Sequence, residues 1–284
     1  MSRAGRALRR VAPLLIAVLL GAAHAALAAA PLAGDAAQLY EKAKGGRYFA
    51  ASARLGPEIV PTSDGRSLLT VWRAAGGAAT PKHWIVSLHG QRGFATDDLA
   101  LWSRHLEGRD VGLVSVQWWL GHGDASGAYY TPEQIYREVD LALQSLGAHP
   151  GSVMLHGFSR GAANSYAIAA LDAGRGKRYF SLCVASSGGV GLDYPPTLAI
   201  SAGEYGPRPL AGTRWITSAG GRDPNPERDG IAGMRRAAAW LSEQGAIVVE
   251  RIEDPDLGHG ALMLGAKHAR RVLDVFLLAG RRDE

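Results

Sequence analysis

The sequence has 284 residues, of which 47% are hydrophobic and 20% are charged. This length and composition suit one compact domain and exclude a disordered, collagen-like or coiled-coil chain. The formal net charge is +5, but four arginines lie within the first ten positions, and without them 27 basic residues stand against 26 acidic ones. The charge therefore predicts binding of neither nucleic acid nor a membrane surface.

The first 28 residues are typical of a cleaved export signal. An apolar run at 11–23 follows the basic residues Arg3, Arg6, Arg9 and Arg10. This run is short against the roughly 20 residues of a membrane-spanning helix. Two A-x-A patterns then end at Ala25 and Ala28, as cleavage sites do. We expect export to the periplasm or the medium, with no membrane insertion after cleavage. The alternative is an uncleaved membrane anchor.

After this leader, hydrophobic runs and turn signals predict strands that alternate with helices. In chain order, we expect a helix at 35–44, strands at 55–61, 67–73 and 84–88, a helix at 97–107, a strand at 113–117, a helix at 132–146, a strand at 153–156 with a helix ending near 171, strands at 179–186 and 214–218, a helix at 227–244, a strand at 246–252 and a helix at 261–278. The turn Ser63-Asp64-Gly65 joins the first two strands into a hairpin.

This order predicts an α/β fold with a mostly parallel central sheet, helices on both faces and an antiparallel hairpin at its N-terminal side. We expect the folded domain at 55–284, preceded by an N-terminal extension at 29–54. No amphipathic helix is evident in the Gly- and Pro-rich segment 187–212, which predicts little or no cap and an open cleft. Active groups gather at the carboxyl ends of parallel strands, so chemistry is sought after each strand.

The segment Gly157-Phe158-Ser159-Arg160-Gly161 follows the strand at 153–156 and begins a helix. G-x-S-x-G at a strand-to-helix turn is the nucleophile-elbow pattern. The sharp turn places the serine hydroxyl above the sheet, and the glycines avoid clashes with neighbouring backbone. The alternative is a serine in an ordinary turn. The placement predicts that Ser159 is a nucleophile.

With this motif in its structural context, the chain resembles an α/β-hydrolase over about residues 55–280. The resemblance implies a serine hydrolase whose nucleophile, acid and histidine follow in that order. It places the acid at Asp223, after the strand at 214–218, and the base at His259, after the strand at 246–252. A serine needs such an imidazole to take its proton, and the acid fixes the tautomer of the imidazole.

Other residues compete for these two roles. His122 lies in a loop and is the main rival to His259, while Asp229 and Asp254 are the rivals to Asp223. Asp223 could also be a simple turn residue before a proline.

The resemblance also implies an oxyanion hole of two backbone N–H groups. One is expected from Arg160, which follows the nucleophile. The other is expected from Gln91 in the turn His89-Gly90-Gln91-Arg92-Gly93, which is similar to the HG-x-x-G turn of the family. His89 is then expected to hold this loop rather than to act as a second base.

Two adjacent tryptophans, Trp118 and Trp119, follow the strand at 113–117 and are candidates for substrate binding. The alternative is that at least one of them belongs to the core. The sequence contains no H-E-x-x-H, C-x-x-C or Gly-rich phosphate loop, so we expect neither a metal nor a cofactor.

These features together predict an exported hydrolase of small-molecule or polymeric carboxylic esters, acting through an acyl-enzyme. Two further hypotheses stay open: a serine peptidase of the prolyl-oligopeptidase-like type, and a non-catalytic binding protein with a hydrolase-like fold.

Overall fold

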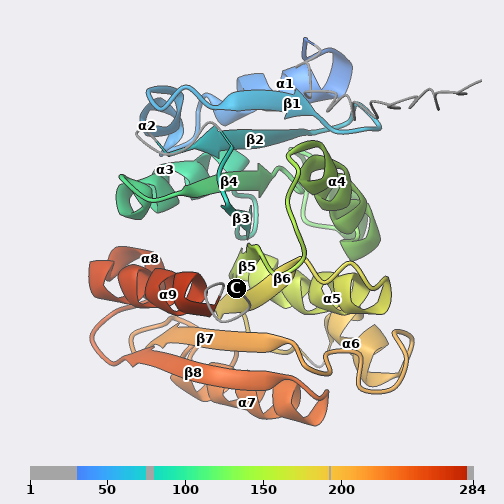
Figure 1. Cartoon of the computed structure of the whole chain (residues 1–284), viewed down its shortest axis with the longest axis vertical. Coiled ribbons are helices and arrows are strands. Elements are labelled where there is room, and N and C mark those ends of the chain that lie inside the picture. The colour runs from blue at the N-terminus through green and yellow to red at the C-terminus, as the bar shows by residue number, and fades with distance from the viewer. Residues whose placement is uncertain (1–30, 75–79, 192, 280–284) are drawn as a thin grey trace, which may run out of the picture.

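The computed structural model describes residues 31–74, 80–191 and 193–279. Within them the chain forms one eight-stranded sheet in the order β1-β2-β4-β3-β5-β6-β7-β8 (Figure 1). The strands are β1 (Glu58–Pro61), β2 (Leu68–Arg73), β3 (His83–Leu88), β4 (Val111–Val116), β5 (Val153–Phe158), β6 (Phe180–Ser186), β7 (Arg214–Gly220) and β8 (Ile247–Asp254). Only the β1–β2 and β2–β4 pairs are antiparallel. The predicted α/β class, parallel sheet and N-terminal hairpin are confirmed.

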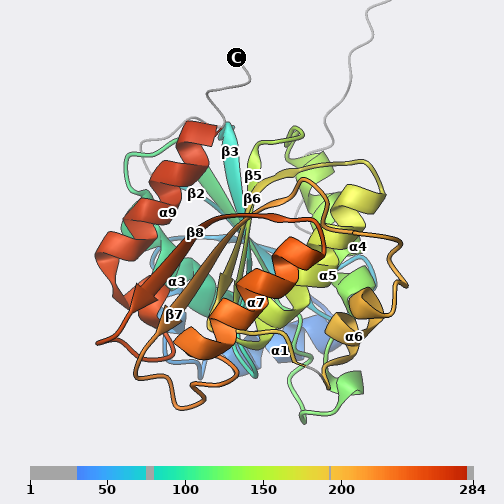
Figure 2. The same cartoon turned by 90° about the horizontal axis from the view of Figure 1, so that it is seen from below.

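Helices cover both faces of this sheet (Figure 2). They are α1 (Gly34–Ala43), α2 (Phe49–Ala53), α3 (Ala95–Leu106), α4 (Pro132–Ser145), α5 (Arg160–Gly174), α6 (Pro195–Ser201), α7 (Ile231–Glu243), α8 (Ala261–Leu264) and α9 (Ala266–Ala279), with a short 3-10 turn η1 (Ser126–Ala128). α3 and α9 pack on one face through a cluster that contains Trp102 and Phe276. α4, α5 and α7 pack on the other face around Tyr136, Tyr166 and Leu241. The central strands are buried on both sides, which explains their continuous apolar character.

Local signals set the bounds of several elements. The Thr131 side chain caps α4 by accepting a hydrogen bond from the Gln134 N–H, and the Gln134 side chain accepts one from the Thr131 N–H. Pro132 occupies the first helical position. The predicted start of this helix is therefore confirmed.

The structure departs from the predicted elements in the C-terminal half. The helix expected from 227 begins at Ile231, because the N–H groups of Arg228, Asp229 and Gly230 all bond the carbonyl of Asn225 in a turn. The single helix expected at 261–278 is two helices, since Gly265 leaves helical geometry with φ −88° and ψ 92°.

Two short helices were not expected from the sequence. α2 lies in the N-terminal extension, and α6 lies in the segment at 187–212 that was expected to be free of helices. α6 has only 7 residues, so the connection between β6 and β7 stays small, in keeping with the prediction of little or no cap.

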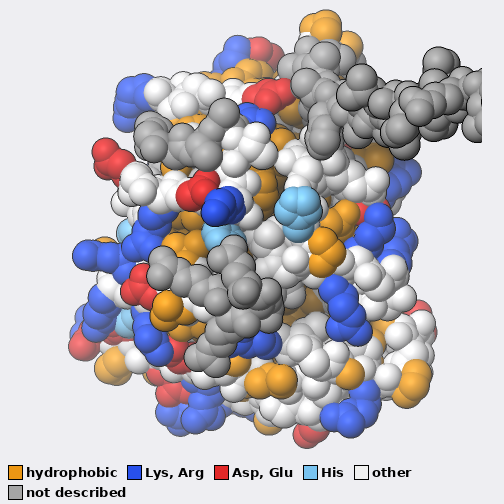
Figure 3. All heavy atoms as spheres, viewed as in Figure 1, with side chains coloured by type: hydrophobic (Ala, Val, Ile, Leu, Met, Phe, Trp, Pro, Cys, Tyr) orange, Lys and Arg blue, Asp and Glu red, His pale blue; other side chains and the backbone are white. Residues whose placement is uncertain are grey.

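The N-terminal extension packs on the body beside the β1 edge of the sheet (Figure 1). Lys42 of α1 hydrogen-bonds the carbonyl of Gly121 and lies over the ring of Trp119. The predicted leader at 1–28 lies outside the described residues, so its cleavage stays a prediction. Among the helices that the structure does describe, none is long and apolar enough to span a membrane. Basic, acidic and apolar side chains are interspersed on the face shown in Figure 3.

Candidate active site

Ser159 occupies a sharp turn between β5 and α5. Its backbone has φ 54° and ψ −123°, a strained conformation for a residue with a side chain. A β-carbon added at Gly157 would lie 2.5 Å from the carbonyl oxygen of Gly161, and one added at Gly161 would lie 2.3 Å from that of Leu88. Both glycines of the motif are therefore required by close backbone packing, as the sequence pattern predicts.

The structure brings Ser159, His259 and Asp223 together. His259 follows β8, and its Nε2 lies 2.9 Å from Ser159 Oγ. Asp223 follows β7, and its Oδ2 lies 2.7 Å from His259 Nδ1. The Asp223 side chain is fully buried, whereas that of His259 is 30% exposed. The three side chains thus form a continuous hydrogen-bonded chain that ends at a surface cavity.

These bonds fix the tautomer of His259. A carboxylate only accepts, so His259 Nδ1–H donates to Asp223 and leaves Nε2 free to accept from the Ser159 hydroxyl. The N–H of Asn225 donates to the second oxygen of Asp223 at 2.9 Å and fixes its orientation. A hydroxyl, an imidazole and a carboxylate therefore lie within hydrogen-bond reach of one another, which is the geometry that a serine nucleophile, its base and an orienting acid require.

Close backbone contacts position the loops that carry this chain. A β-carbon at Gly220, the last residue of β7, would lie 2.2 Å from the carbonyl oxygen of Leu257, two residues before His259. A β-carbon at Gly188 would lie 2.0 Å from the carbonyl oxygen of Ser159. Neither glycine was identified from the sequence, because each contact joins segments that are distant in the chain.

Asp229, one of the two rivals for the role of the acid, also lies near the site. Its carboxylate is held by the guanidinium of the adjacent Arg228 through bonds of 2.7 to 3.0 Å. Within the described chain, Asp223, Asp229 and His259 are the one group that could hold a metal ion, with ligand atoms within 4.8 Å of one another. A metal there would have to displace the hydrogen bonds that Asp223 accepts from Asn225 and His259 and those that Asp229 accepts from Arg228.

Asp254 and His122, the remaining rivals for the acid and the base, lie apart from this hydrogen-bonded chain. Asp254 bonds His268 of α9 at 2.7 Å, which explains a lowered pKa for its carboxyl group. His122 is exposed, and its Nδ1 lies 3.1 Å from the carbonyl oxygen of Leu120.

The loop expected to complete the oxyanion hole lies beside the serine. A β-carbon at Gly90 would lie 3.3 Å from Ser159 Cβ, and Gln91 lines the same cavity as Ser159 and Arg160. The N–H groups of Gln91 and Arg160 therefore belong to segments next to Ser159. Their role in binding an oxyanion stays a prediction.

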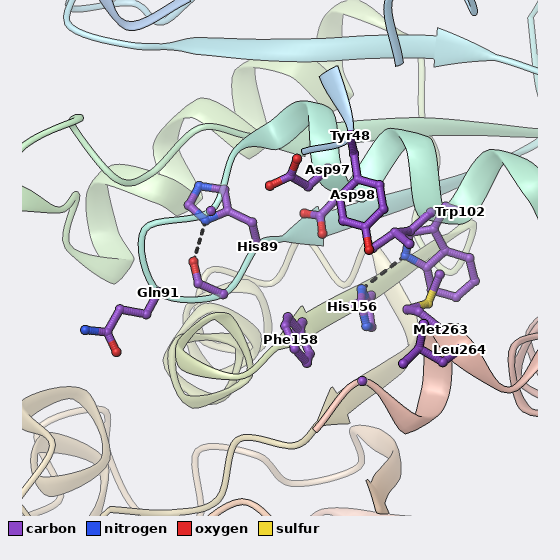
Figure 4. Close-up of a pocket in the computed structure, with 14 residues that line it drawn as sticks. Tyr48, His89, Gln91, Asp97, Asp98, Trp102, His156, Phe158, Met263 and Leu264 are labelled. Carbon is purple, nitrogen blue, oxygen red and sulfur yellow. Dashed lines mark hydrogen bonds between the residues drawn. The ribbon is translucent and has the colours of Figure 1, made fainter. Parts of the chain in front are cut away.

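His89 holds this loop in place (Figure 4). The Trp118 N–H donates to His89 Nε2 at 3.3 Å, so the proton is on Nδ1, which donates to the Gly90 carbonyl at 2.8 Å. Burial lowers the pKa of His89 to about 4, and the ring is neutral near pH 7. These contacts fit the expectation that His89 is structural.

The tryptophan pair lies mainly within the core. Trp118 is 1% exposed and donates its indole N–H to the His89 carbonyl, and Trp119 is 6% exposed and donates to the Gly123 carbonyl. Trp118 still contributes to the lining of a cavity beside Arg160, so its part in substrate binding stays a prediction. The ring of Trp119 packs edge-on against Phe94 in the main hydrophobic cluster, which removes it from water.

Asp124 ties the turn that contains Gln91 and Arg92 to the glycine-rich loop after β4, a contact that the sequence did not reveal. Its carboxylate accepts from Arg92 Nε at 2.7 Å and from Gln91 Nε2 at 3.1 Å. Its backbone carbonyl accepts from the Arg160 guanidinium, which lies 4.0 Å from the ring centre of Tyr129. The cavity next to Ser159 has a volume of about 240 Å³, and its lining is mainly polar, with Arg160, Asp193 and Arg228 beside the single aromatic ring of Tyr194.

The comparison with solved structures agrees with this architecture. No family model and no curated protein matches the chain. Among solved structures, a hyperthermophilic esterase from Pyrobaculum calidifontis superposes with a TM-score of 0.60 at 16% identity, covering 88% of this chain and 94% of the esterase. Brefeldin A esterase, a bacterial homologue of human hormone-sensitive lipase, superposes with a TM-score of 0.53 at 20% identity, covering 89% and 87%. At these identities the likeness concerns the fold, and the chain has the α/β-hydrolase fold.

Proposed function

We propose that this protein is an exported serine hydrolase that cleaves carboxylic esters through an acyl-enzyme. The observation that carries the proposal is the chain from Ser159 Oγ through His259 to the buried Asp223, with bonds of 2.9 and 2.7 Å. The esterases among the solved structures of the same fold support an ester as the substrate. Small-molecule and polymeric esters are both candidate substrates.

In the first half of the reaction, Ser159 Oγ attacks the ester carbonyl while His259 Nε2 takes its proton. Negative charge then develops on the carbonyl oxygen, where the N–H groups of Arg160 and Gln91 are proposed to donate. The tetrahedral intermediate collapses as His259 returns the proton to the departing alcohol. This step leaves the acyl group on Ser159.

In the second half, His259 takes a proton from water, and the resulting hydroxide equivalent attacks the acyl carbon. Collapse of the second intermediate returns the proton to Ser159 Oγ and releases the carboxylic acid. Asp223 accepts a hydrogen bond from the imidazole throughout and stabilises its cationic form.

The reaction class is tested with nitrophenyl esters, with the nitroanilides that differ from them only at the scissile atom, and with dipeptide amides. We expect turnover of nitrophenyl esters of short and medium acids, with slow or no turnover of the corresponding nitroanilides and dipeptide amides, and covalent labelling by a fluorophosphonate. Faster cleavage of the amides would assign the peptidase function instead. A folded sample that neither turns over esters nor reacts with the probe would assign the non-catalytic role.

Export rests on the basic and apolar pattern of residues 1–28. We expect the full-length chain, expressed in a bacterium, to be recovered from the periplasm or medium with an N-terminus directly after Ala25 or Ala28. Recovery of the intact N-terminus in the membrane fraction would instead support an uncleaved anchor.

A further inference from the structure

Arg160 places a cationic side chain at the cavity that contains Ser159. It directly follows Ser159 as the first residue of α5, and it lines this cavity together with Tyr194. Its guanidinium lies over the ring of Tyr129, 4.0 Å from the ring centre, and 5.9 Å from the ring centre of Tyr194. Aromatic faces attract a guanidinium without neutralising its charge. The side chain is therefore held in place and keeps its positive charge.

Arg160 differs from two neighbouring arginines in having no carboxylate partner. Arg92 of the turn after β3 pairs with Asp124, and Arg228, which also lines the cavity, pairs with Asp229 through bonds of 2.7 to 3.0 Å. Within the described chain, no carboxylate forms an ion pair with the Arg160 guanidinium, although all three arginines lie near Ser159. The charge of Arg160 is thus available to a ligand.

The hydrogen-bonding capacity of this guanidinium is also largely unused. Of its five N–H donors, one bonds the backbone carbonyl of Asp124 at a long 3.4 Å and another bonds the hydroxyl of Tyr194. No further acceptor among the described residues bonds this half-buried side chain. A half-buried arginine normally has an anion or several acceptors around it. The missing partner is therefore expected to come from the substrate.

Two aspartates of the cavity lining restrict where an anion can bind. Asp229 is buried and engaged by Arg228, and Asp193 is exposed and interacts electrostatically with the same arginine. Together with Arg160 and Arg228, these residues bring the formal charge of the lining to zero. The cavity as a whole does not attract anions, so an anion gains only through direct contact with Arg160.

We propose that Arg160 binds a carboxylate group of the substrate in the cavity beside Ser159, which makes the enzyme selective for esters with a negative charge near the scissile bond. This inference rests on the proposed ester hydrolysis. One guanidinium can donate two parallel N–H bonds to a carboxylate, and such charge-assisted bonds are stronger than those to a neutral acceptor. Glu133 and Glu204 line the other cavity that Arg160 borders, so we expect the carboxylate on the Ser159 side.

The test compares monomethyl esters of succinic, glutaric and adipic acids with the corresponding ester amides, in which CONH2 replaces the carboxylate. The two members of each pair have nearly the same size and can both accept hydrogen bonds, so they differ mainly in charge. We expect kcat/KM to be about tenfold higher or more for the best carboxylate ester than for its amide.

A second set, O-acetylglycolate and O-acetylglycolamide, places the charge in the alcohol half of the ester. The set that shows the preference identifies the half that contacts Arg160. Equal or lower kcat/KM for the carboxylate member of every pair would overturn the inference and leave the proposed ester hydrolysis intact.

Variants then assign the preference to one side chain. Arg160→Gln is expected to bring the ratio of kcat/KM between a carboxylate ester and its amide to within about twofold of one. The ratio is the measured quantity, because the Arg160 N–H is also a predicted oxyanion donor and a change there would affect both substrates alike. A preference that persisted in Arg160→Gln would overturn the inference.

Arg175→Gln is the matched control for this change. Arg175 directly follows the last residue of α5, and its guanidinium lies 5.1 Å from the ring centre of Tyr136, but it does not line the cavity. This variant removes the same charge from the other end of the helix and should retain the preference. An equal loss of preference in both variants would mean that net charge rather than contact with Arg160 is responsible.

If Arg160→Gln does not fold, Asp193→Asn tests the same charge from the opposite direction. This change removes a negative charge from the cavity lining and leaves Arg160 intact, and the exposed position of Asp193 makes unfolding unlikely to follow. The preference for the carboxylate ester is expected to rise about twofold or more. An unchanged or lower preference would overturn the inference.

A binding measurement separates this inference from the proposed function. Ser159→Ala keeps the Arg160 side chain and is expected to form no acyl-enzyme. In calorimetry with this variant, monomethyl glutarate or O-acetylglycolate is expected to bind about tenfold more tightly than its amide, and Ser159→Ala/Arg160→Gln should lose the difference. Equal binding within both pairs would show that the cavity recognises no carboxylate. Selective binding, with no hydrolysis of any ester by the wild-type protein, would instead contradict the proposed function alone.

Discussion

Replacing Ser159 with alanine is expected to lower kcat for a nitrophenyl ester by about a millionfold, the effect of removing the nucleophile from a serine triad. Alanine lacks the oxygen that lies 2.9 Å from His259 Nε2, so no acyl-enzyme can form. Steady-state kinetics on an ester and loss of fluorophosphonate labelling measure the effect. The fold should be retained, because alanine and serine are similarly strained at the φ of 54° that position 159 adopts.

Ser165→Ala provides the control for this change. Ser165 is buried on the same helix, α5, where its hydroxyl donates to the carbonyl of Ala162 at 2.7 Å. Losing one such bond costs about 1 kcal/mol of stability, and the rate should stay within a few fold of wild type. If Ser159→Ala retained the wild-type rate while labelling persisted elsewhere, the nucleophile would have to be another residue.

Asp223→Asn is expected to lower kcat by about ten-thousandfold, with little change in KM, because it reverses the tautomer of the base. The amide nitrogen of asparagine would donate to His259 Nδ1, which places the imidazole hydrogen on Nε2. Nε2 then faces Ser159 Oγ as a donor and can no longer take its proton. Ester kinetics near pH 7, with circular dichroism to verify folding, measure this loss.

Asp229→Asn is the matched control, since it changes a second buried carboxylate in the same cluster. Its carboxylate is engaged by Arg228 rather than by the imidazole, so we expect a loss of about tenfold or less. An equal or greater loss in Asp229→Asn than in Asp223→Asn would transfer the role of the acid to Asp229.

Structural features that depend on residues close together in the sequence could be predicted from the sequence. The alternation of strands and helices follows from hydrophobic period and turn residues, and the start of α4 follows from Thr131 and Pro132. The position of Ser159 at a strand-to-helix turn follows from the glycines around it, because only glycine fits backbone contacts of 2.3 to 2.5 Å. His259 and Asp223 were placed by resemblance to a fold rather than by local pattern.

Contacts between segments that are distant in the sequence could be identified only in the folded structure. Ser159 and His259 are 100 positions apart, and the choice of Asp223 over Asp229 depends on which carboxylate faces the imidazole and which faces Arg228. The tryptophans illustrate the same limit, since the strand end where Trp118 lies is covered by the His89 loop and is not open to solvent. The bond between Trp102 and His156 joins α3 to β5, so no local pattern reveals it.

The amino-acid sequence alone was sufficient to predict the α/β architecture and the strained turn at Ser159, because both depend on residues that are close together in the sequence. The pairing of Asp223 with His259 and the burial of the tryptophans depend on long-range packing. Packing is decided by the shapes of many side chains at once, so these features became visible only when the elements were assembled in three dimensions.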